Sequence, residues 1–420
     1  MYKFVINGSR TLHGSVKISG SKNATLPLMA ASLLARGKYV ITNIPLLRDV
    51  ITMKQLLESI GVSVEFENHR MVLDSSDYNT LEAPYKLVKK MRASIYVLGP
   101  LLAKNGYAKV SLPGGCAWGP RPVNFHIDSM KKMGAKIELE KGYIVARAKR
   151  LKGAEILFDF PSVGATGNVM MAASLAKGTT VVQNAAMEPE LVNLGQFLNA
   201  MGARISGLGT NRLTIEGVDE LHPANVTVIP DRIEAGTFLI AGAITRGEIT
   251  IQDAEVSHLT SILSKLRDTG ASISTSGSSI TLRAEKKIRS VSISTAVYPG
   301  FPTDMQAQWM ALMCVADKTS VITDNVYLDR FAHVPELLRL GANITLDGNV
   351  AAVTGVKKLT GATVMSTDLR ASASLILAGL VAEGKTEVLR IYHIDRGYES
   401  IEKKLQSLGA DIQRVRTEEY

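Results

Sequence analysis

One pattern occurs six times along the sequence, and it constrains the fold more than any other feature. In each copy an amphipathic helical pattern ends in glycine, and a β-rich segment usually follows. Glycine directly after the last helical residue is typical of a helix C-terminus. Successive copies lie 73, 68, 68, 71 and 68 residues apart. The six glycines are Gly61, Gly134, Gly202, Gly270, Gly341 and Gly409.

A second pattern precedes each of these glycines, namely a helix rich in small residues followed by a strand. The clearest copies span residues 28–41 and 169–182, and weaker ones begin at Ser94, Thr237, Met305 and Ser374. Small side chains on this first helix would let it pack closely at a buried position. We therefore predict an α/β fold built from six β-α-β-α-β-β repeats.

The two ends of the chain indicate how the repeats are grouped. The sixth copy has only one strand after Gly409, and residues 1–8 have the alternating pattern of the missing strand. We expect this N-terminal strand to complete the sixth repeat. The prediction is two domains of three repeats, one spanning 20–229 and the other 1–19 plus 230–420, with 217–230 as the expected crossover.

Composition excludes several classes of protein. The chain has 420 residues, 46% of them hydrophobic, yet no signal-peptide pattern and no run of 18 apolar residues, so we expect no membrane association. Two cysteines are too few for a disulfide framework, which favours a cytoplasmic protein with reduced thiols. We expect Cys314, which stands in an apolar run, to be buried and structural.

The net positive charge of the chain does not by itself decide which class of molecule it binds. The net charge is +9, but basic residues are scattered and aromatic residues make up only 5% of the chain. Nucleic-acid binding is therefore disfavoured, while small anionic substrates explain the charge equally well. We find no Cys/His metal spacing and no phosphate-loop or dinucleotide motif, so we expect no metal and no cofactor.

The stretch from Leu112 to Ile127 carries the most distinctive chemistry. Two glycines precede the thiol of Cys116, and Arg121 and Pro122 follow before a helical pattern begins. A thiol close to a guanidinium and a helix start has a lowered pKa and greater reactivity. The alternative is a glycine- and proline-rich surface turn that carries an incidental cysteine, and this stretch alone does not decide between them.

Polar residues also recur where the first helix of each repeat begins. Helix N-termini attract anions through their free N–H groups and positive dipole. Ser162, Thr303 and Asp368 could simply be N-caps, whereas Lys22, Arg92 and Arg370 oppose the dipole and so indicate a bound anion. Arg330 and Arg396, in turns before second helices, could be solvated charges or part of the same site. The residues at the first-helix starts are Lys22, Asn23, Arg92, Ser162, Asp231, Arg232, Thr303, Asp304, Asp368 and Arg370.

Seven stretches of the chain, in order, resemble motifs of the enolpyruvyl transferase family. The resemblance covers the full length and implies two inside-out α/β domains around a cleft. It also implies transfer of the enolpyruvyl group of phosphoenolpyruvate to the 3′-hydroxyl of UDP-N-acetylglucosamine, a step of peptidoglycan synthesis, and a reactive cysteine that the epoxide fosfomycin alkylates. The stretches are 20–23, 91–94, 112–127, 162–166, 302–304, 367–372 and 393–397.

The resemblance also implies residue roles. Cys116 is the expected general acid and Asp304 the expected base or orienting group, with Lys22 and Arg396 completing the catalytic set. Phe160 departs from the lysine found there in some relatives. The residues implied for phosphoenolpyruvate are Lys22, Asn23, Arg121, Arg330, Arg370 and Arg396. Those implied for the nucleotide sugar are Asn23, Arg92, Arg121, Pro122, Val123, Asn124, Phe125, Ser162, Val163, Asp304 and Val326.

Two alternatives remain at this point. The first is a shikimate-3-phosphate enolpyruvyl transferase, which shares the fold but lacks the cysteine loop. The second is a basic repeat protein that binds nucleic acid without chemistry, against which the scarcity of stacking aromatic residues counts.

Overall fold

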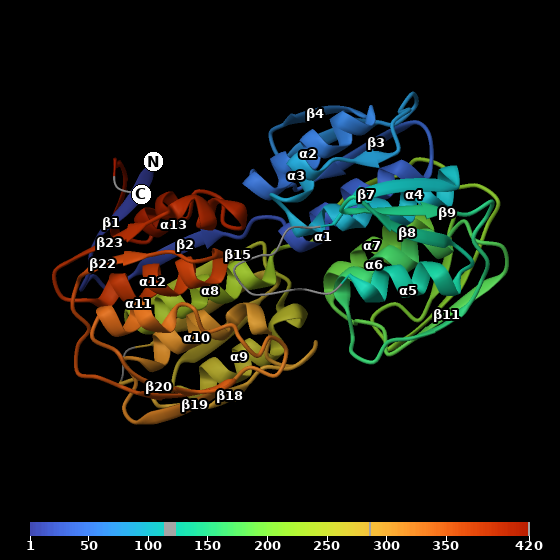
Figure 1. Ribbon diagram of the computed structural model, residues 1–420. Helices are drawn as coiled ribbons and strands as arrows, with labels where there is room; N and C mark the ends of the chain where they lie inside the picture. The colour runs from blue at the N-terminus through green and yellow to red at the C-terminus, as the bar shows by residue number, and fades with distance from the viewer. Residues whose placement is uncertain (113–122, 285–286, 419–420) are drawn as a thin grey trace. The chain divides into compact units, whose positions relative to one another are not determined.

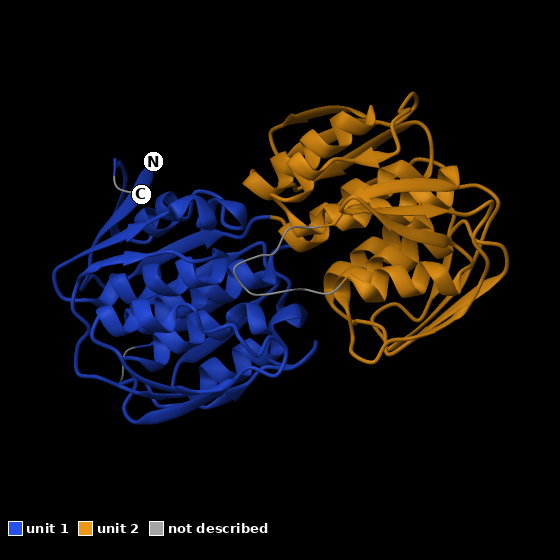
Figure 2. Cartoon of the chain, viewed as in Figure 1, with its two compact units in different colours: residues 1–19, 230–420 blue, residues 20–229 orange. Residues whose placement is uncertain are grey.

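The computed structural model describes residues 1–112, 123–284 and 287–418. The chain forms two compact units, residues 20–229 and residues 1–19 with 230–420 (Figure 2), which are the ranges expected from the repeats. Each unit has its own hydrophobic core. Both crossings between the units fall beside glycine or proline, at Ser19–Gly20 and Ile229–Pro230.

Every repeat forms one four-stranded sheet with the same pairing. The first strand runs parallel to the second, and the remaining neighbours are antiparallel. In residues 20–229 the strand orders are β14 (Asn225–Thr227)–β3 (Lys38–Thr42)–β5 (Arg70–Asp74)–β4 (Ser63–Glu67), β6 (Glu82–Ala83)–β7 (Tyr107–Ser111)–β9 (Tyr143–Arg147)–β8 (Lys136–Glu140), and β10 (Glu155–Leu157)–β11 (Thr179–Gln183)–β13 (Arg212–Glu216)–β12 (Arg204–Ser206).

The other unit repeats this arrangement. Its strand orders are β2 (His13–Lys17)–β15 (Glu248–Gln252)–β17 (Ser279–Arg283)–β16 (Ser272–Ser276), β18 (Ile293–Ser294)–β19 (Thr319–Thr323)–β21 (Val350–Thr354)–β20 (Asn343–Asp347), and β22 (Thr363–Met365)–β23 (Lys385–Leu389)–β1 (Tyr2–Asn7)–β24 (Asp411–Arg416).

The first helix of each repeat is buried almost all round. All eight residues of α10 are buried, as are 12 of the 13 residues of α8. Helices α8, α10 and α12 pack against one another within their unit (Figure 1), so the helices form the interior and the sheets the outside. This is the inside-out α/β arrangement. The first helices are α1 (Lys22–Ala31), η2 (Arg92–Val97) running into α4 (Leu98–Asn105), α6 (Val163–Ala173), α8 (Arg232–Ile244), η4 (Thr303–Met305) running into α10 (Gln306–Met313), and α12 (Leu369–Val381).

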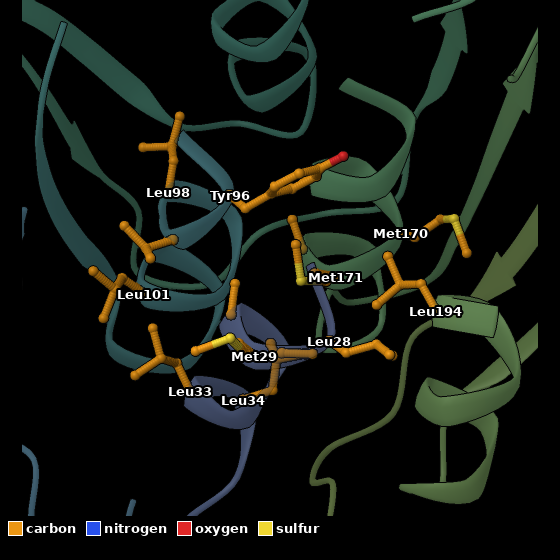
Figure 3. Packing of buried hydrophobic residues seen from close by; sticks show 14 of the residues in the cluster. Leu28, Met29, Leu33, Leu34, Tyr96, Leu98, Leu101, Met170, Met171 and Leu194 are labelled. Atoms are coloured by element: carbon orange, nitrogen blue, oxygen red, sulfur yellow. The ribbon is translucent and has the colours of Figure 1, made fainter. Parts of the chain in front are cut away.

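The first helices pack against one another in the core of residues 20–229. Leu28 and Met29 of α1, Leu101 of α4 and Met171 of α6 lie together there (Figure 3). A side chain at Gly167 on α6 would come within 2.9 Å of the Tyr96 ring, so a small residue is required where these helices meet.

The second helices bury only one face, as the amphipathic pattern predicts. In α2 the buried side chains include Val50, Met53 and Leu57. All six repeat glycines have positive φ, between +86° and +107°, so the predicted helix ends are confirmed. The second helices are α2 (Arg48–Ile60), α5 (Asn124–Lys132), α7 (Pro189–Ala200), α9 (Thr260–Asp268), α11 (Val334–Arg339) and α13 (Ile401–Ser407). Short extra turns are η1 (Ser32–Leu34), α3 (Tyr85–Val88), η3 (Val256–Leu259) and η5 (Ile391–Arg396).

Three of the sheets are completed by a strand that lies far along the chain from the rest of its sheet. Strand β1 lies between β23 and β24, with Phe4 opposite both Val388 and Arg414, which confirms that the N-terminal strand completes the sixth repeat. Two further exchanges are unexpected: β2 is the parallel edge strand of the fourth repeat, and β14 is that of the first. The expected crossover at 217–230 therefore contains a strand of the first unit. Within the described ranges, no helix combines the length and the apolar character needed to span a membrane.

Candidate active site

An aspartate held by two arginines forms a charge cluster in the unit of residues 1–19 and 230–420. Asp304 lies in η4, where its Oδ1 is 2.7 Å from Arg330 Nη1 and its Oδ2 is 2.8 Å from Arg370 Nη2. The side chains of Arg330 and Arg370 are 10% and 6% exposed, against 26% for Asp304. The carboxylate is thus the more accessible part of a largely buried cluster.

The local fold fixes both arginines. Arg370 is the second residue of α12, whose N-cap Asp368 accepts hydrogen bonds from the backbone N–H groups of Arg370 (2.7 Å) and Ala371 (3.3 Å). Arg330 follows β19 in the turn before α11, and its Nη1 also donates to the hydroxyl of Thr303 at 3.1 Å. The repeat geometry therefore places one arginine at a first-helix start and the other in a turn before a second helix.

Thr303 does not act as an N-cap, which was the alternative role that its residue type allowed. Pro302 occupies the cap position of η4, and the Thr303 hydroxyl instead donates to Asp324 Oδ2 at 2.7 Å. Asp324 Oδ1 also accepts from the backbone N–H of Val326 at 3.0 Å. Asp324 therefore accepts hydrogen bonds both from Val326, which was expected to contact the nucleotide sugar, and from Thr303, which itself accepts one from Arg330.

Electrostatics keep this cluster ionised. Burial opposes the charge on Asp304, but Arg370 and Arg330 outweigh it and hold the pKa of this carboxyl well below its usual range. Burial likewise opposes the charge on Arg370, and Asp304 more than offsets it, so the pKa of Arg370 is raised. For Asp368 burial is the largest influence and raises the pKa, against the opposing charge of Arg330.

In the unit of residues 20–229, Lys22 begins α1 after the N-cap Ser21, whose Oγ accepts from the backbone N–H of Ala24 at 3.3 Å. The Lys22 Nζ lies 3.4 Å from Oδ2 of the buried Asp49 on α2. Asn23 follows Lys22 on the same turn and is half-buried. The fold thus holds a cation at a helix N-terminus, where it is unfavourable for the helix dipole itself.

Three other helix starts of this unit carry expected ligand contacts. Arg92 begins η2, and Val123 is the N-cap of α5, where Asn124 and Phe125 form the first turn. Ser162 caps α6 by accepting from the backbone N–H of Ala165 at 3.3 Å, and Val163 is the first residue of that helix. Helices α5 and α6 pack against each other.

A buried histidine, which sequence reasoning missed, joins these elements. Asn168 Nδ2 donates to Nδ1 of His126 at 2.9 Å and to the Ile95 carbonyl at 2.9 Å, so the His126 proton is on Nε2. Burial, with the charge of Arg92 adding to it, lowers the pKa of His126 to about 3. A side chain at Gly164 would come within 3.2 Å of the ring, so neutral His126 packs at the start of α6.

The remaining expected residues fall in two groups. Cys116, Arg121 and Pro122 lie outside the described residues. Arg396 is the last residue of η5, two positions before Tyr398, which contacts Arg370.

Cys314 is fully buried, which raises the pKa of its thiol to about 12, and its structural role is confirmed. Among the described residues, no group of three or more His, Cys, Asp or Glu side chains could hold a metal ion.

Comparison with known proteins decides the family. The family model described as EPSP synthase (3-phosphoshikimate 1-carboxyvinyltransferase) matches residues 6–405. A UDP-N-acetylglucosamine 1-carboxyvinyltransferase from Chloroherpeton thalassium is 60% identical over 423 residues, which cover 100% of this chain and 99% of the relative. The chain belongs to the enolpyruvyl transferase family.

Solved structures show the same fold. The enolpyruvyl transferase NikO from Streptomyces tendae superposes with a TM-score of 0.89 at 27% identity, over 99% of both chains. An EPSP synthase from Acinetobacter baumannii gives a TM-score of 0.76 at 18% identity, over 99% of this chain and 100% of that chain. The second likeness is one of fold alone. As a member of this family, the chain is a transferase.

Proposed function

We propose that this transferase moves the enolpyruvyl group of phosphoenolpyruvate to the 3′-hydroxyl of UDP-N-acetylglucosamine and releases phosphate, a cytoplasmic step of peptidoglycan synthesis. The observation that carries the proposal is the 60% identity over the whole chain to a relative named for this acceptor. The shikimate enzyme is disfavoured, because the EPSP synthase from Acinetobacter baumannii is only 18% identical to this chain. A non-enzymatic nucleic-acid protein is disfavoured by the family itself.

Phosphoenolpyruvate carries a phosphate and a carboxylate, and the proposal assigns cations to both. Lys22, Arg121 and Arg396 are assigned to the phosphate, and Arg330 and Arg370 to the carboxylate. Guanidinium groups match the geometry of carboxylates and phosphates through paired N–H donors. The half-buried Lys22 and the nearly buried Arg370 support this, since cations held with little exposure bind anions under weak solvent screening.

The nucleotide sugar is assigned chiefly to helix starts within residues 20–229. Arg92, Asn124, Phe125 and Val163 lie at the beginnings of η2, α5 and α6, where the positive end of the helix dipole suits a diphosphate. Asn23, Arg121, Pro122, Val123, Ser162, Asp304 and Val326 complete the proposed set.

Two residues are assigned the proton transfers. Asp304 accepts the proton of the 3′-hydroxyl while the oxygen of that hydroxyl bonds to the central carbon of phosphoenolpyruvate. At the same time Cys116 donates a proton to the methylene carbon. Phosphate then leaves, and loss of a proton from the new methyl group restores the double bond. Such acid–base assistance typically contributes about 10²–10⁴-fold per group.

The arginine pair bears directly on the basicity of Asp304. While Arg330 and Arg370 hold it, its pKa is well below its usual range, so it is a weak base. A substrate carboxylate that engages the same two guanidinium groups would weaken their hold and raise that pKa. The proposal is therefore that phosphoenolpyruvate itself prepares Asp304 for proton transfer.

Phosphate release tests the function. The protein should release phosphate from phosphoenolpyruvate with UDP-N-acetylglucosamine and not with shikimate-3-phosphate. Phosphate release with shikimate-3-phosphate but not with UDP-N-acetylglucosamine would contradict the assignment. The absence of phosphate release with both acceptors would contradict it as well.

Lys22→Ala should raise the KM for phosphoenolpyruvate and lower kcat, because it removes a cation assigned to the phosphate. Steady-state kinetics with each substrate varied in turn would measure both changes. Lys38→Ala is the matched control, since it removes one positive charge of the same unit from a pair with Asp74 in which the lysine side chain is 76% exposed. Kinetics of Lys22→Ala equal to those of Lys38→Ala would exclude Lys22 from the site.

A further inference from the structure

We propose that Tyr398 is a positioning residue, whose hydroxyl orients the guanidinium of Arg370 toward Asp304 and toward the substrate carboxylate. This inference rests on the proposed function, because it assigns Arg370 to phosphoenolpyruvate. Tyr398 comes from the segment between η5 and α13, and it was not among the residues expected at the site.

The contact is direct and fully enclosed. Arg370 Nη1 donates to the Tyr398 hydroxyl at 3.2 Å, while Nη2 of the same guanidinium pairs with Asp304 at 2.8 Å. Tyr398 is 2% exposed and Arg370 is 5% exposed. One edge of the guanidinium is therefore held by a phenol, and the other faces the carboxylate. A planar group fixed at two nitrogens has little freedom to rotate.

The phenol is itself oriented by two helices of the same unit. It lies 2.8 Å from the Thr237 hydroxyl on α8 and accepts from Gln308 Nε2 on α10 at 3.2 Å. The Thr237 hydroxyl donates to the Ile233 carbonyl at 2.8 Å, so the Tyr398 proton points to Thr237. The lone pairs of Tyr398 then remain for Arg370 and Gln308.

The same hydrogen-bond network reaches η4, the short helix that carries Asp304. Gln308 Nε2 also donates to the backbone carbonyl of Asp304 at 2.9 Å. Burial raises the pKa of Tyr398, which keeps the phenol protonated and able to hold this pattern. Tyr398 thus links the guanidinium of Arg370 to the helix that carries Asp304. An aromatic ring alone would fill the space without providing this link.

Tyr398→Phe tests the inference because it removes one oxygen and keeps the ring. The buried Arg370 then loses a partner, and a hydrogen bond to a charged group is worth enough to change kcat/KM about 10- to 100-fold. We expect kcat/KM for phosphoenolpyruvate to fall within that range, with the KM for UDP-N-acetylglucosamine nearly unchanged. Steady-state kinetics would measure the split, and thermal unfolding would show that the variant is folded.

Ser374→Ala is the matched control. It removes a buried hydroxyl from α12, the helix that carries Arg370, and this hydroxyl donates to the Ala371 carbonyl at 2.8 Å. If Tyr398 positions Arg370, Tyr398→Phe should raise the KM for phosphoenolpyruvate and Ser374→Ala should not. Equal kinetics for the two variants, unchanged kinetics of Tyr398→Phe, or its failure to fold would each overturn the inference.

A double variant adds an independent check. Once Arg370→Lys has removed the planar donor, Tyr398→Phe should cost little more, whereas additive losses would show that Tyr398 acts elsewhere. Failure of the proposed function is distinguishable, because the unmodified protein would then not release phosphate with UDP-N-acetylglucosamine at all.

Discussion

Asp304→Asn is expected to lower kcat about 10²–10⁴-fold while the KM for phosphoenolpyruvate stays the same or falls. An amide cannot accept the proton of the acceptor hydroxyl. It also carries no charge to compete for Arg330 and Arg370, which Asp304 contacts at 2.7 and 2.8 Å. The arginine pair would therefore be more available to the substrate carboxylate. Phosphate-release kinetics at varied phosphoenolpyruvate would show both effects.

The same variant should also be less stable. Removing one partner of a buried ion pair costs about 3–5 kcal/mol, and the 26% exposure of the Asp304 side chain favours the lower end. Because the pKa of Asp304 is lowered in the folded protein, its contribution is fully present above the unfolded-state pKa, about 4. The gap in unfolding free energy between the two proteins should therefore shrink as the pH falls below that value toward the folded-state pKa.

Asp253→Asn provides the control for these measurements. It removes one negative charge of the same unit from a pair with Lys17 in which the side chains are 57% and 74% exposed. We expect its kinetics and stability to stay close to those of the unmodified protein, because exposed pairs contribute little. If the kcat of Asp304→Asn lay within twofold of the kcat of the unmodified protein, Asp304 would not be the group that accepts the proton.

The repeats were predictable because glycine has a local signature. Gly61 and Gly409 follow helical patterns, and both adopt the left-handed backbone that glycine tolerates best. The pairing of β2 with β15 and of β14 with β3 was not predictable in the same way. Which edge a short strand joins depends on contacts between distant segments, and three-residue strands such as β14 carry almost no periodicity.

Apart from the residues implied by the family resemblance, the sequence pattern singled out mainly the charged residues of the candidate site. Asp304 and Arg370 stood out because charges at helix starts need a reason, and the structure brings them into contact. His126 and Tyr398 gave no such signal, since a histidine on an amphipathic helix and a tyrosine near a turn are ordinary core residues. Their importance comes from the partners that the fold supplies, Asn168 for His126 and Arg370 for Tyr398.

Cys116→Ser should lower turnover about as strongly as Asp304→Asn, by about 10²–10⁴-fold. Cys116 lies outside the described residues, so its assignment rests on the sequence. A serine hydroxyl is far too weakly acidic to give its proton to the methylene carbon of phosphoenolpyruvate. Cys116→Asp supplies a carboxyl group that can donate when protonated, and it should keep partial activity that improves as the pH is lowered. Phosphate release across a pH series would separate the two variants.

Fosfomycin separates the thiol's reactivity from its acidity. The epoxide should add once to the unmodified protein and to Cys116→Asp not at all, because a carboxylate is a poor nucleophile for this reaction. Cys314→Ala is the control and should still be labelled once, since Cys314 is fully buried and burial raises the pKa of its thiol to about 12. Mass spectrometry of the intact variants would count the adducts. Labelling of Cys116→Asp, or parental turnover by Cys116→Ser, would mean that Cys116 is neither the reactive thiol nor the general acid.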